Sequence, residues 1–133
     1  MLHAMLDTNV CIRVIRDKPE KSRERFEAET GKLAISTIVL HELHGGIHRS
    51  YAAERHLEEL EAFLPNVTIV DFDNGAAVHS AEIKADLLRR GCIIGPNDLL
   101  IAGHACSLGL KLITGNLREF GRVDGLRCED WLA

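Results

Sequence analysis

The sequence predicts an α/β fold in which a parallel sheet is covered by helices on both faces. Short apolar runs of three or four residues alternate with longer segments of helical periodicity, and most runs stop at small polar residues that can begin a helix. Strands that are apolar throughout and are joined by helices are typical of parallel sheets. The 133 residues, 46% of them hydrophobic, suffice for one core but not for two, so we expect a single domain over residues 1–133.

Five apolar runs are the expected strands. The first stops at residues 7–9 (Asp-Thr-Asn), and the second stops at Ser36 and Thr37, two residue types that often cap helices. The third and fourth are also followed by mostly polar segments, at 71–74 and 114–116. The strands are expected at residues 4–6, 33–35, 67–70, 111–113 and, as a short fifth strand, near 126–128.

Helical periodicity fills the segments between these strands. The first helix begins within residues 7–9, and the second follows Pro19, which suits a first helical position. Gly91 and Gly109 mark the ends of the last two long helices. The sequence Gly-Pro-Asn at 95–97 indicates a turn. The remaining helices are expected at residues 37–49, 52–64, from the polar residues 71–74 to 90, and 98–108.

The composition excludes several classes of protein. Sixteen basic against twenty acidic residues give a net charge of -4, which argues against a protein that coats nucleic acid through nonspecific phosphate contacts. One Trp, one Tyr and four Phe leave no platform for stacking bases. No apolar stretch approaches the roughly 18 to 20 residues of a membrane span. The N-terminus lacks the features of a secretion signal, and the four cysteines are widely spaced, so we expect a cytoplasmic protein with reduced thiols and no membrane association.

Three carboxylates occupy positions that need an explanation. Asp7 follows the first strand and begins a helix, where a simple N-cap role is also open. Glu42 falls inside the apolar stripe of its helix, about 40° from Ile38 on a helical wheel. There it needs a compensating partner, unless it reaches the edge of the stripe and water. Asp98 lies in the first turn of a helix that is apolar almost all round, where it could also serve only the helix N-terminus.

A parallel sheet brings such positions to one edge, so we expect the three acids to gather there. Carboxylates held close together stay partly protonated unless a cation joins them. Oxygen ligands of this kind suit Mg²⁺ or Mn²⁺ better than zinc. A site that holds such an ion on carboxylates is suited to hydrolysing phosphodiesters, because the metal activates water and offsets charge on the phosphate.

Four motifs extend this pattern along nearly the whole chain. They are Met5-Leu6-Asp7-Thr8-Asn9, Ser36-x-x-x-x-x-Glu42, Gly95-Pro96-Asn97-Asp98-x-x-Ile101-Ala102-x-x-Ala105 and Leu112-Ile113-Thr114-x-Asn116-x-x-Glu119-Phe120. The set resembles the PIN-domain ribonucleases, and most of all the VapC toxins of bacterial type II toxin–antitoxin pairs. The resemblance implies one PIN domain with a five-stranded parallel sheet, a homodimer, and Mg²⁺- or Mn²⁺-dependent cleavage of structured RNA, commonly tRNA. It also implies neutralisation by a cognate VapB antitoxin, with operator DNA contacted only through that antitoxin.

The resemblance also assigns roles to individual residues. Asp7, Glu42 and Asp98 would be the core acids, with Asp7 and Asp98 the direct metal ligands and Glu42 binding the ion or orienting the attacking water. Thr114 and Asn116 would position water or phosphate. The chain departs from many PIN domains because Asn116 stands where they have a fourth acid, and Glu119 lies one helical turn further on. We favour Asn116, which is closer to the strand end, and leave Glu119 open. Gly115 stands where a larger polar residue is expected.

Other interpretations of these residues are weaker. A binding module that only docks an antitoxin and represses an operator would not need all three acids. His41, His44 and His48 resemble a zinc site, but H-E-x-x-H requires a histidine at 45, where the chain has Gly45. Asp71 and Asp73 resemble a paired-acid motif, although Asp73 is most simply a helix cap.

One basic segment remains open to two interpretations. Residues 13–25 hold six basic side chains against three acids. This segment is a candidate for phosphate contact near Asp7, and equally for a solvated helix with charge pairs one turn apart.

Overall fold

The sheet has five parallel strands in the order β3-β2-β1-β4-β5. The structure is a computed structural model and describes residues 1–132; Ala133, the last residue of the expected domain, lies outside the described residues. The strands are β1 (Ala4–Leu6), β2 (Leu33–Ser36), β3 (Thr68–Val70), β4 (Lys111–Ile113) and β5 (Cys128–Glu129). The central strand β1 pairs on both sides, with Met5 opposite Ala34 of β2 and Leu112 of β4. The predicted five-stranded parallel sheet is confirmed.

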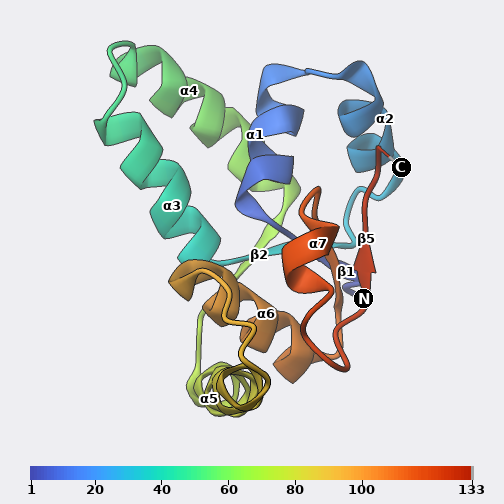
Figure 1. Cartoon of the computed structure of the whole chain (residues 1–133). Helices are drawn as coiled ribbons and strands as arrows, with labels where there is room; N and C mark the ends of the chain where they lie inside the picture. The colour runs from blue at the N-terminus through green and yellow to red at the C-terminus, as the bar shows by residue number, and fades with distance from the viewer. Residues whose placement is uncertain (133) are drawn as a thin grey trace.

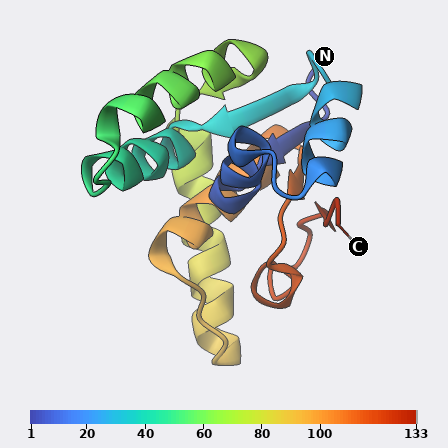
Figure 2. The ribbon, with the colours of Figure 1, turned by 90° about the horizontal axis from the view of Figure 1, so that it is seen from above.

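Helices cover both faces of this sheet. Figure 1 shows α1, α2 and α4 on one side of the sheet and the packed pair α5 and α6 on the other. Figures 1 and 2 show α3 and α4 as an antiparallel pair beyond the end of β2. The helices are α1 (Thr8–Arg16), α2 (Glu20–Ala28), α3 (Thr37–His48), α4 (Ala53–Phe63), the 3-10 turn η1 (Leu64–Asn66), α5 (Asn74–Arg90), α6 (Pro96–Leu108) and α7 (Leu117–Phe120).

The core lies on both faces of β1 and around α6. Every residue of β1 and β2 is buried, as expected of strands covered by helices on both sides. Five consecutive residues of α6, 101–105, are buried as well, which confirms the prediction that this helix is central. None of the helices within residues 1–132 is long and apolar enough to cross a membrane.

The predicted caps are confirmed. Asp73 accepts a hydrogen bond from the backbone N of Ala76 (3.0 Å) and begins α5. Gly91 and Gly109 end α5 and α6 in the left-handed conformation, with φ values of 67° and 66°. Glycine adopts this conformation without the steric cost that a Cβ atom imposes.

The predicted starts of α6 and β5 were wrong, each for a local reason. Residues 95–97 do not form a separate turn: Pro96 begins α6, because proline has no N–H to satisfy and its φ suits a first helical residue. Helix α2 follows Pro19, as predicted, although Pro19 itself stands at the N-cap and not at the first helical position. Strand β5 begins at Cys128, two residues later than expected, because the backbone N of Leu126 donates to the carbonyl of Val123 in a preceding turn.

The contact between α5 and α6 depends on one glycine. A Cβ atom on Gly103 would lie 2.5 Å from Cβ of Ser80 and 2.6 Å from its Cα. Gly103→Ala should therefore force the helices apart and lower the free energy of unfolding by about 1 to 3 kcal/mol. Urea denaturation measures this effect.

Gly46→Ala is the matched control for this substitution. Gly46 lies inside α3, and a Cβ atom there would meet nothing within 4 Å. Alanine in a helix interior is more favourable than glycine by up to about 1 kcal/mol, so this variant should be slightly more stable than the wild type. A Gly103→Ala protein with the stability of the wild type would contradict the packing described for α5 and α6.

Candidate functional site

Asp7 joins the ends of two neighbouring strands. It follows β1, is only 5% exposed, and begins α1 by accepting a hydrogen bond at Oδ1 from the backbone N of Thr8 (2.7 Å). Its other oxygen, Oδ2, accepts from the hydroxyl of Thr114 at the end of β4 (2.8 Å). Both interpretations of Asp7 are therefore confirmed. Oδ1 caps α1, and Oδ2 binds Thr114 at the edge of the sheet.

Glu42 lies where three helices meet. It comes from α3, and its Oε1 accepts a hydrogen bond from the hydroxyl of Thr8 at the start of α1 (2.6 Å). Its Oε2 accepts from the side-chain amide of Asn97 in the first turn of α6 (3.3 Å). Although Val39 and Leu43 on the same helix are buried, Glu42 is only half-buried. The carboxylate is thus compensated by two polar partners and does not turn away into solvent.

Asp98 and Glu119 lie side by side. Oδ2 of Asp98 and Oε1 of Glu119 would lie 3.5 Å and 3.6 Å from a Cβ atom on Gly95. Glu119 accepts a hydrogen bond at Oε1 from the backbone N of Gly95 (2.7 Å) and another at Oε2 from the side-chain amide of Asn116 (2.7 Å). The backbone N of Asn116 in turn donates to the hydroxyl of Thr114 (3.0 Å). This chain of contacts connects Glu119 to Asp7.

A buried polar pair connects the two helices that carry Glu42 and Asp98. Nδ1 of His104 in α6 shares a hydrogen bond of 2.8 Å with the hydroxyl of Ser36, the N-cap of α3. The oxygen of Ser36 also accepts from the backbone N of Ile38 (3.0 Å). Burial lowers the pKa of His104, against the charges of Asp73 and Asp71 that raise it, and so favours the neutral ring. This contact holds the start of α3 against α6.

The structure therefore brings all five predicted site residues to the carboxyl edge of the sheet and adds Glu119 to them. We call Asp7, Glu42, Asp98 and Glu119 the acid cluster. Thr8 and Asn97 were not predicted as partners of Glu42. Their place within the first and third motifs was the only available signal. Within residues 1–132, no three histidine, cysteine, aspartate or glutamate side chains are arranged as they stand to hold a metal ion. His41 and His48 are exposed, so the histidine alternative gains no support.

The family model of the PIN domain matches residues 4–126. The chain belongs to the PIN-domain family. It is 50% identical over 131 residues to the tRNA(fMet)-specific endonuclease VapC of Salmonella typhimurium, covering 98% of this chain and 99% of that protein. It is 45% identical over 132 residues to the Ribonuclease VapC2 of Haemophilus influenzae strain Rd, covering 99% and 100%. The resemblance to VapC proteins inferred from the four motifs is confirmed.

Solved structures agree with this assignment of the PIN domain. A chain in the crystal structure of DNA-bound VapBC from Salmonella typhimurium superposes with a TM-score of 0.94 at 50% identity, covering 98% of this chain and 99% of that one. A chain of VapBC2 from Rickettsia felis, bound to a DNA fragment from its promoter, gives a TM-score of 0.92 at 36% identity, with the same coverage.

Burial and mutual repulsion raise the pKa values of two carboxyl groups in the acid cluster of this PIN domain, Asp98 and Asp7. Burial, a hydrogen bond with Glu119, and the charges of Glu119, Asp7 and Glu42 raise the pKa of Asp98 to about 8. The hydrogen bond from Asp98 lowers the pKa of Glu119. Burial raises the pKa of Asp7, against hydrogen bonds from Thr114 and Thr8 that lower it. Asp98 is therefore the protonated member of the pair with Glu119 at neutral pH.

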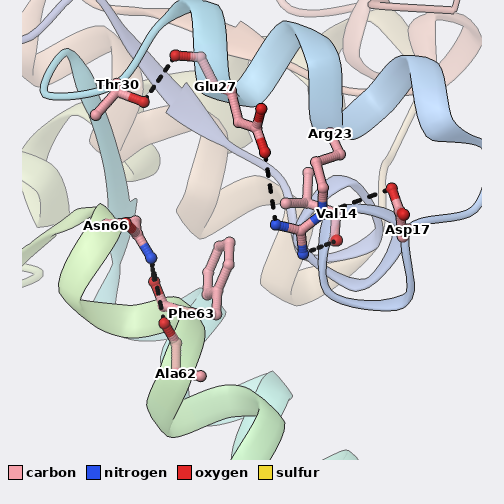
Figure 3. Close-up of polar contacts among 8 residues, drawn as sticks. All are labelled: Val14, Asp17, Arg23, Glu27, Thr30, Ala62, Phe63 and Asn66. Atoms are coloured by element: carbon pink, nitrogen blue, oxygen red, sulfur yellow. Dashed lines mark hydrogen bonds and ion pairs between the residues drawn. The ribbon is translucent and has the colours of Figure 1, made fainter.

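The basic segment at residues 13–25 is used partly for internal contacts. Figure 3 shows the guanidinium of Arg23 donating to the carbonyl oxygen of Val14 (2.9 Å) and lying near Asp17 and Glu27, the latter one turn further along α2. Arg25 pairs with Glu129 of β5. These two cations hold α2 in place, which favours the structural interpretation for this half of the segment.

The raised pKa of Asp98 predicts how stability depends on pH without added metal. Between about pH 4 and pH 8 the folded protein keeps a proton that the unfolded chain has lost, so this carboxyl makes the fold less stable as pH rises through that range. Asp98→Asn removes the effect. In EDTA, its melting temperature should exceed that of the wild type by a margin that grows from pH 5 to pH 8. A margin that does not change with pH would contradict this prediction.

Proposed function

We propose that the chain is a metal-dependent endoribonuclease toxin of the VapC type that cleaves structured RNA. The observation that carries the proposal is the meeting of Asp7, Glu42 and Asp98, from three separate parts of the chain, at the carboxyl edge of a parallel sheet. Relatives that match over nearly the full chain are named ribonucleases, and one is named for tRNA(fMet). We therefore propose tRNA as the substrate and tRNA(fMet) as the first to test.

The acid cluster fits Mg²⁺ or Mn²⁺ by the chemistry of its donors. All of its charged groups are carboxylates, which these cations prefer. The proton shared by Asp98 and Glu119 offsets part of their mutual repulsion, and a divalent cation would offset more. We propose Asp7 and Asp98 as direct ligands, with Glu42 holding the ion or the attacking water. When bound, the ion lowers the pKa of water and offsets the negative charge that builds on the phosphate.

The polar neighbours of the acids would fix their orientation. Thr114 and the backbone N of Thr8 each hold one oxygen of Asp7. Oε2 of Glu42 has the longer of its two hydrogen bonds, so we infer that this oxygen would accept a proton from the attacking water. As the water oxygen bonds to phosphorus, the P–O bond to the leaving ribose oxygen would break, and that oxygen would take a proton from solvent. The contacts of Thr114 and Asn116 support a positioning role, through Asp7 and Glu119 respectively.

We propose a VapB-type antitoxin as the partner that neutralises this activity, with operator DNA reached only through the antitoxin. The chains of similar structure come from VapBC complexes of Salmonella typhimurium and Rickettsia felis, both with DNA. Substrate and antitoxin would meet the chain in the cytoplasm. The homodimer implied by the resemblance stays a prediction, which light scattering of the purified protein tests.

Expression in bacteria with and without the cognate antitoxin tests this function. Alone, the chain should arrest growth while one tRNA is cut, and co-expression of the antitoxin should prevent both effects. The Asp7→Asn protein should neither arrest growth nor cut tRNA, although it should still bind the antitoxin. A binding module would instead repress an operator reporter together with the antitoxin and leave every RNA intact. Growth arrest with all tRNAs intact would contradict the proposed substrate.

A further inference from the structure

Arg13 places a cation at the border of the acid cluster. It comes from α1, and its guanidinium lies against the backbone of Gly115: a Cβ atom there would be 2.7 Å from Nη1 and 3.0 Å from Nη2. Gly115 lies between Thr114, which holds Asp7, and Asn116, which holds Glu119. Figure 1 shows the segment between β4 and α7 beside α1.

In the part of the chain that the structure describes, the guanidinium of Arg13 is unpaired, unlike two other cations of the basic segment. Within residues 1–132, Arg13 makes no side-chain hydrogen bond and no ion pair, whereas Arg23 and Arg25 of the same basic segment are both paired. Arg13 is also half-buried, and its guanidinium lies close to the backbone of Gly115. Half-buried cations normally have a compensating partner, which points to a ligand that supplies the negative charge.

The glycine at 115 is what permits this position. The resemblance to VapC toxins predicts a larger polar residue at this position. Any side chain would overlap Nη1 of Arg13, and the backbone of Gly115 is not in the left-handed region, so glycine is not required by its own conformation. Gly115 therefore leaves room for the guanidinium beside Thr114 and Asn116.

We propose that Arg13 binds a phosphate of the RNA backbone adjacent to the phosphate that is cleaved, and that Gly115 makes room for this contact. The inference rests on the proposed function, because it names a substrate contact of the same site. A guanidinium offers two parallel N–H donors to the non-bridging oxygens of a phosphate. The acid cluster repels the RNA backbone, and a cation at its border offsets that repulsion where the substrate must enter.

Single-turnover cleavage of tRNA tests this contact, with RNA concentration and salt both varied. Arg13→Gln should raise the RNA concentration needed for the half-maximal rate by about tenfold and reduce the slope of log affinity against log salt by about one. Arg13→Lys should recover part of the affinity, because it keeps the charge and loses the paired donors. Gly115→Ala, which displaces the guanidinium without removing it, should change affinity in the same direction.

Arg89→Gln is the matched control, because Arg89 is an exposed residue of α5 whose one ion pair within the described residues is with Asp86. It removes the same charge and should cleave tRNA as the wild type does. Binding of uncut tRNA in an Asp98→Asn background, followed by fluorescence anisotropy, separates affinity from the chemical step. The Mg²⁺ concentration needed for half-maximal cleavage should be the same in the wild type and in Arg13→Gln.

The outcomes distinguish this inference from the proposed function. If the wild type cleaves tRNA while Arg13→Gln and Gly115→Ala keep its affinity and salt slope, the inference is overturned and the function stands. If Arg13→Gln leaves RNA affinity unchanged but weakens inhibition by the antitoxin, Arg13 belongs to the antitoxin contact, which also overturns the inference. If the wild type cleaves no tRNA, the proposed function fails, and this inference fails with it.

Discussion

Asp7→Asn, Glu42→Gln and Asp98→Asn are each expected to reduce RNA cleavage by at least about 100-fold and to abolish growth arrest. Each substitution keeps the size of the side chain but replaces a carboxyl group of the acid cluster with an amide, which cannot become negatively charged. Asp7 and Asp98 lose a proposed metal ligand, while Glu42 loses the oxygen proposed to accept a proton from water. Cleavage of purified tRNA, with circular dichroism to verify folding, measures the effect.

Asp71→Asn is the control for these three variants. Asp71 also follows a strand, β3, but it is exposed and makes no side-chain hydrogen bond within the described residues. The Asp71→Asn variant makes the same replacement of a carboxyl group by an amide, and it should cleave tRNA at the wild-type rate. Full activity in any two of the three cluster variants would contradict the assignment of the acid cluster as the catalytic site.

Glu119→Gln is expected to weaken Mn²⁺ binding and to reduce cleavage by roughly 10- to 100-fold. The variant removes the fourth carboxylate, which lies beside Asp98. Asn116→Ala should have a smaller effect on Mn²⁺ affinity, because it removes a donor to Glu119 while Gly95 still holds the other oxygen. Calorimetric titration with Mn²⁺ and single-turnover cleavage measure both variants.

A greater loss of cleavage in Asn116→Ala than in Glu119→Gln would assign the fourth position of the site to Asn116. The motif alone favoured Asn116, because it is closer to the end of β4, and the contacts of Glu119 now favour an acid held in place by Asn116. If Asn116→Ala destroys turnover while Glu119→Gln remains active, Asn116 acts on water or phosphate directly. Asn116→Asp adds a carboxylate at the position where many PIN domains have one, and it should tighten Mn²⁺ binding.

Much of this site could be predicted because it lies at strand ends. Apolar runs that stop at polar residues located Asp7 and Thr114 in the chain, and the rule for parallel sheets placed them at one edge. The helical wheel singled out Glu42 because a carboxylate within an apolar stripe needs a partner. These inferences require only local periodicity, which a sequence displays directly.

The partners could not be predicted because they depend on how distant elements pack. Thr8 is 34 residues from Glu42, and Asn97 is 55 residues from it, so neither hydrogen bond leaves a local pattern. The start of α6 was missed at Pro96, which moved Asn97 from an expected turn into a helix beside Glu42. The contact of Arg13 with Gly115 likewise depends on the packing of α1 against the end of β4.

Cleavage of tRNA(fMet) under titration with Mg²⁺ tests the central claim most directly, using wild-type and Asp98→Asn proteins side by side. The wild type should cleave at a rate that rises with Mg²⁺, reaches saturation and falls to background in EDTA. Asp98→Asn should remain at background throughout, while it still binds the uncut RNA. Equal cleavage by the two proteins, or cleavage by the wild type that persists in EDTA, would contradict a metal-dependent nuclease site at the acid cluster.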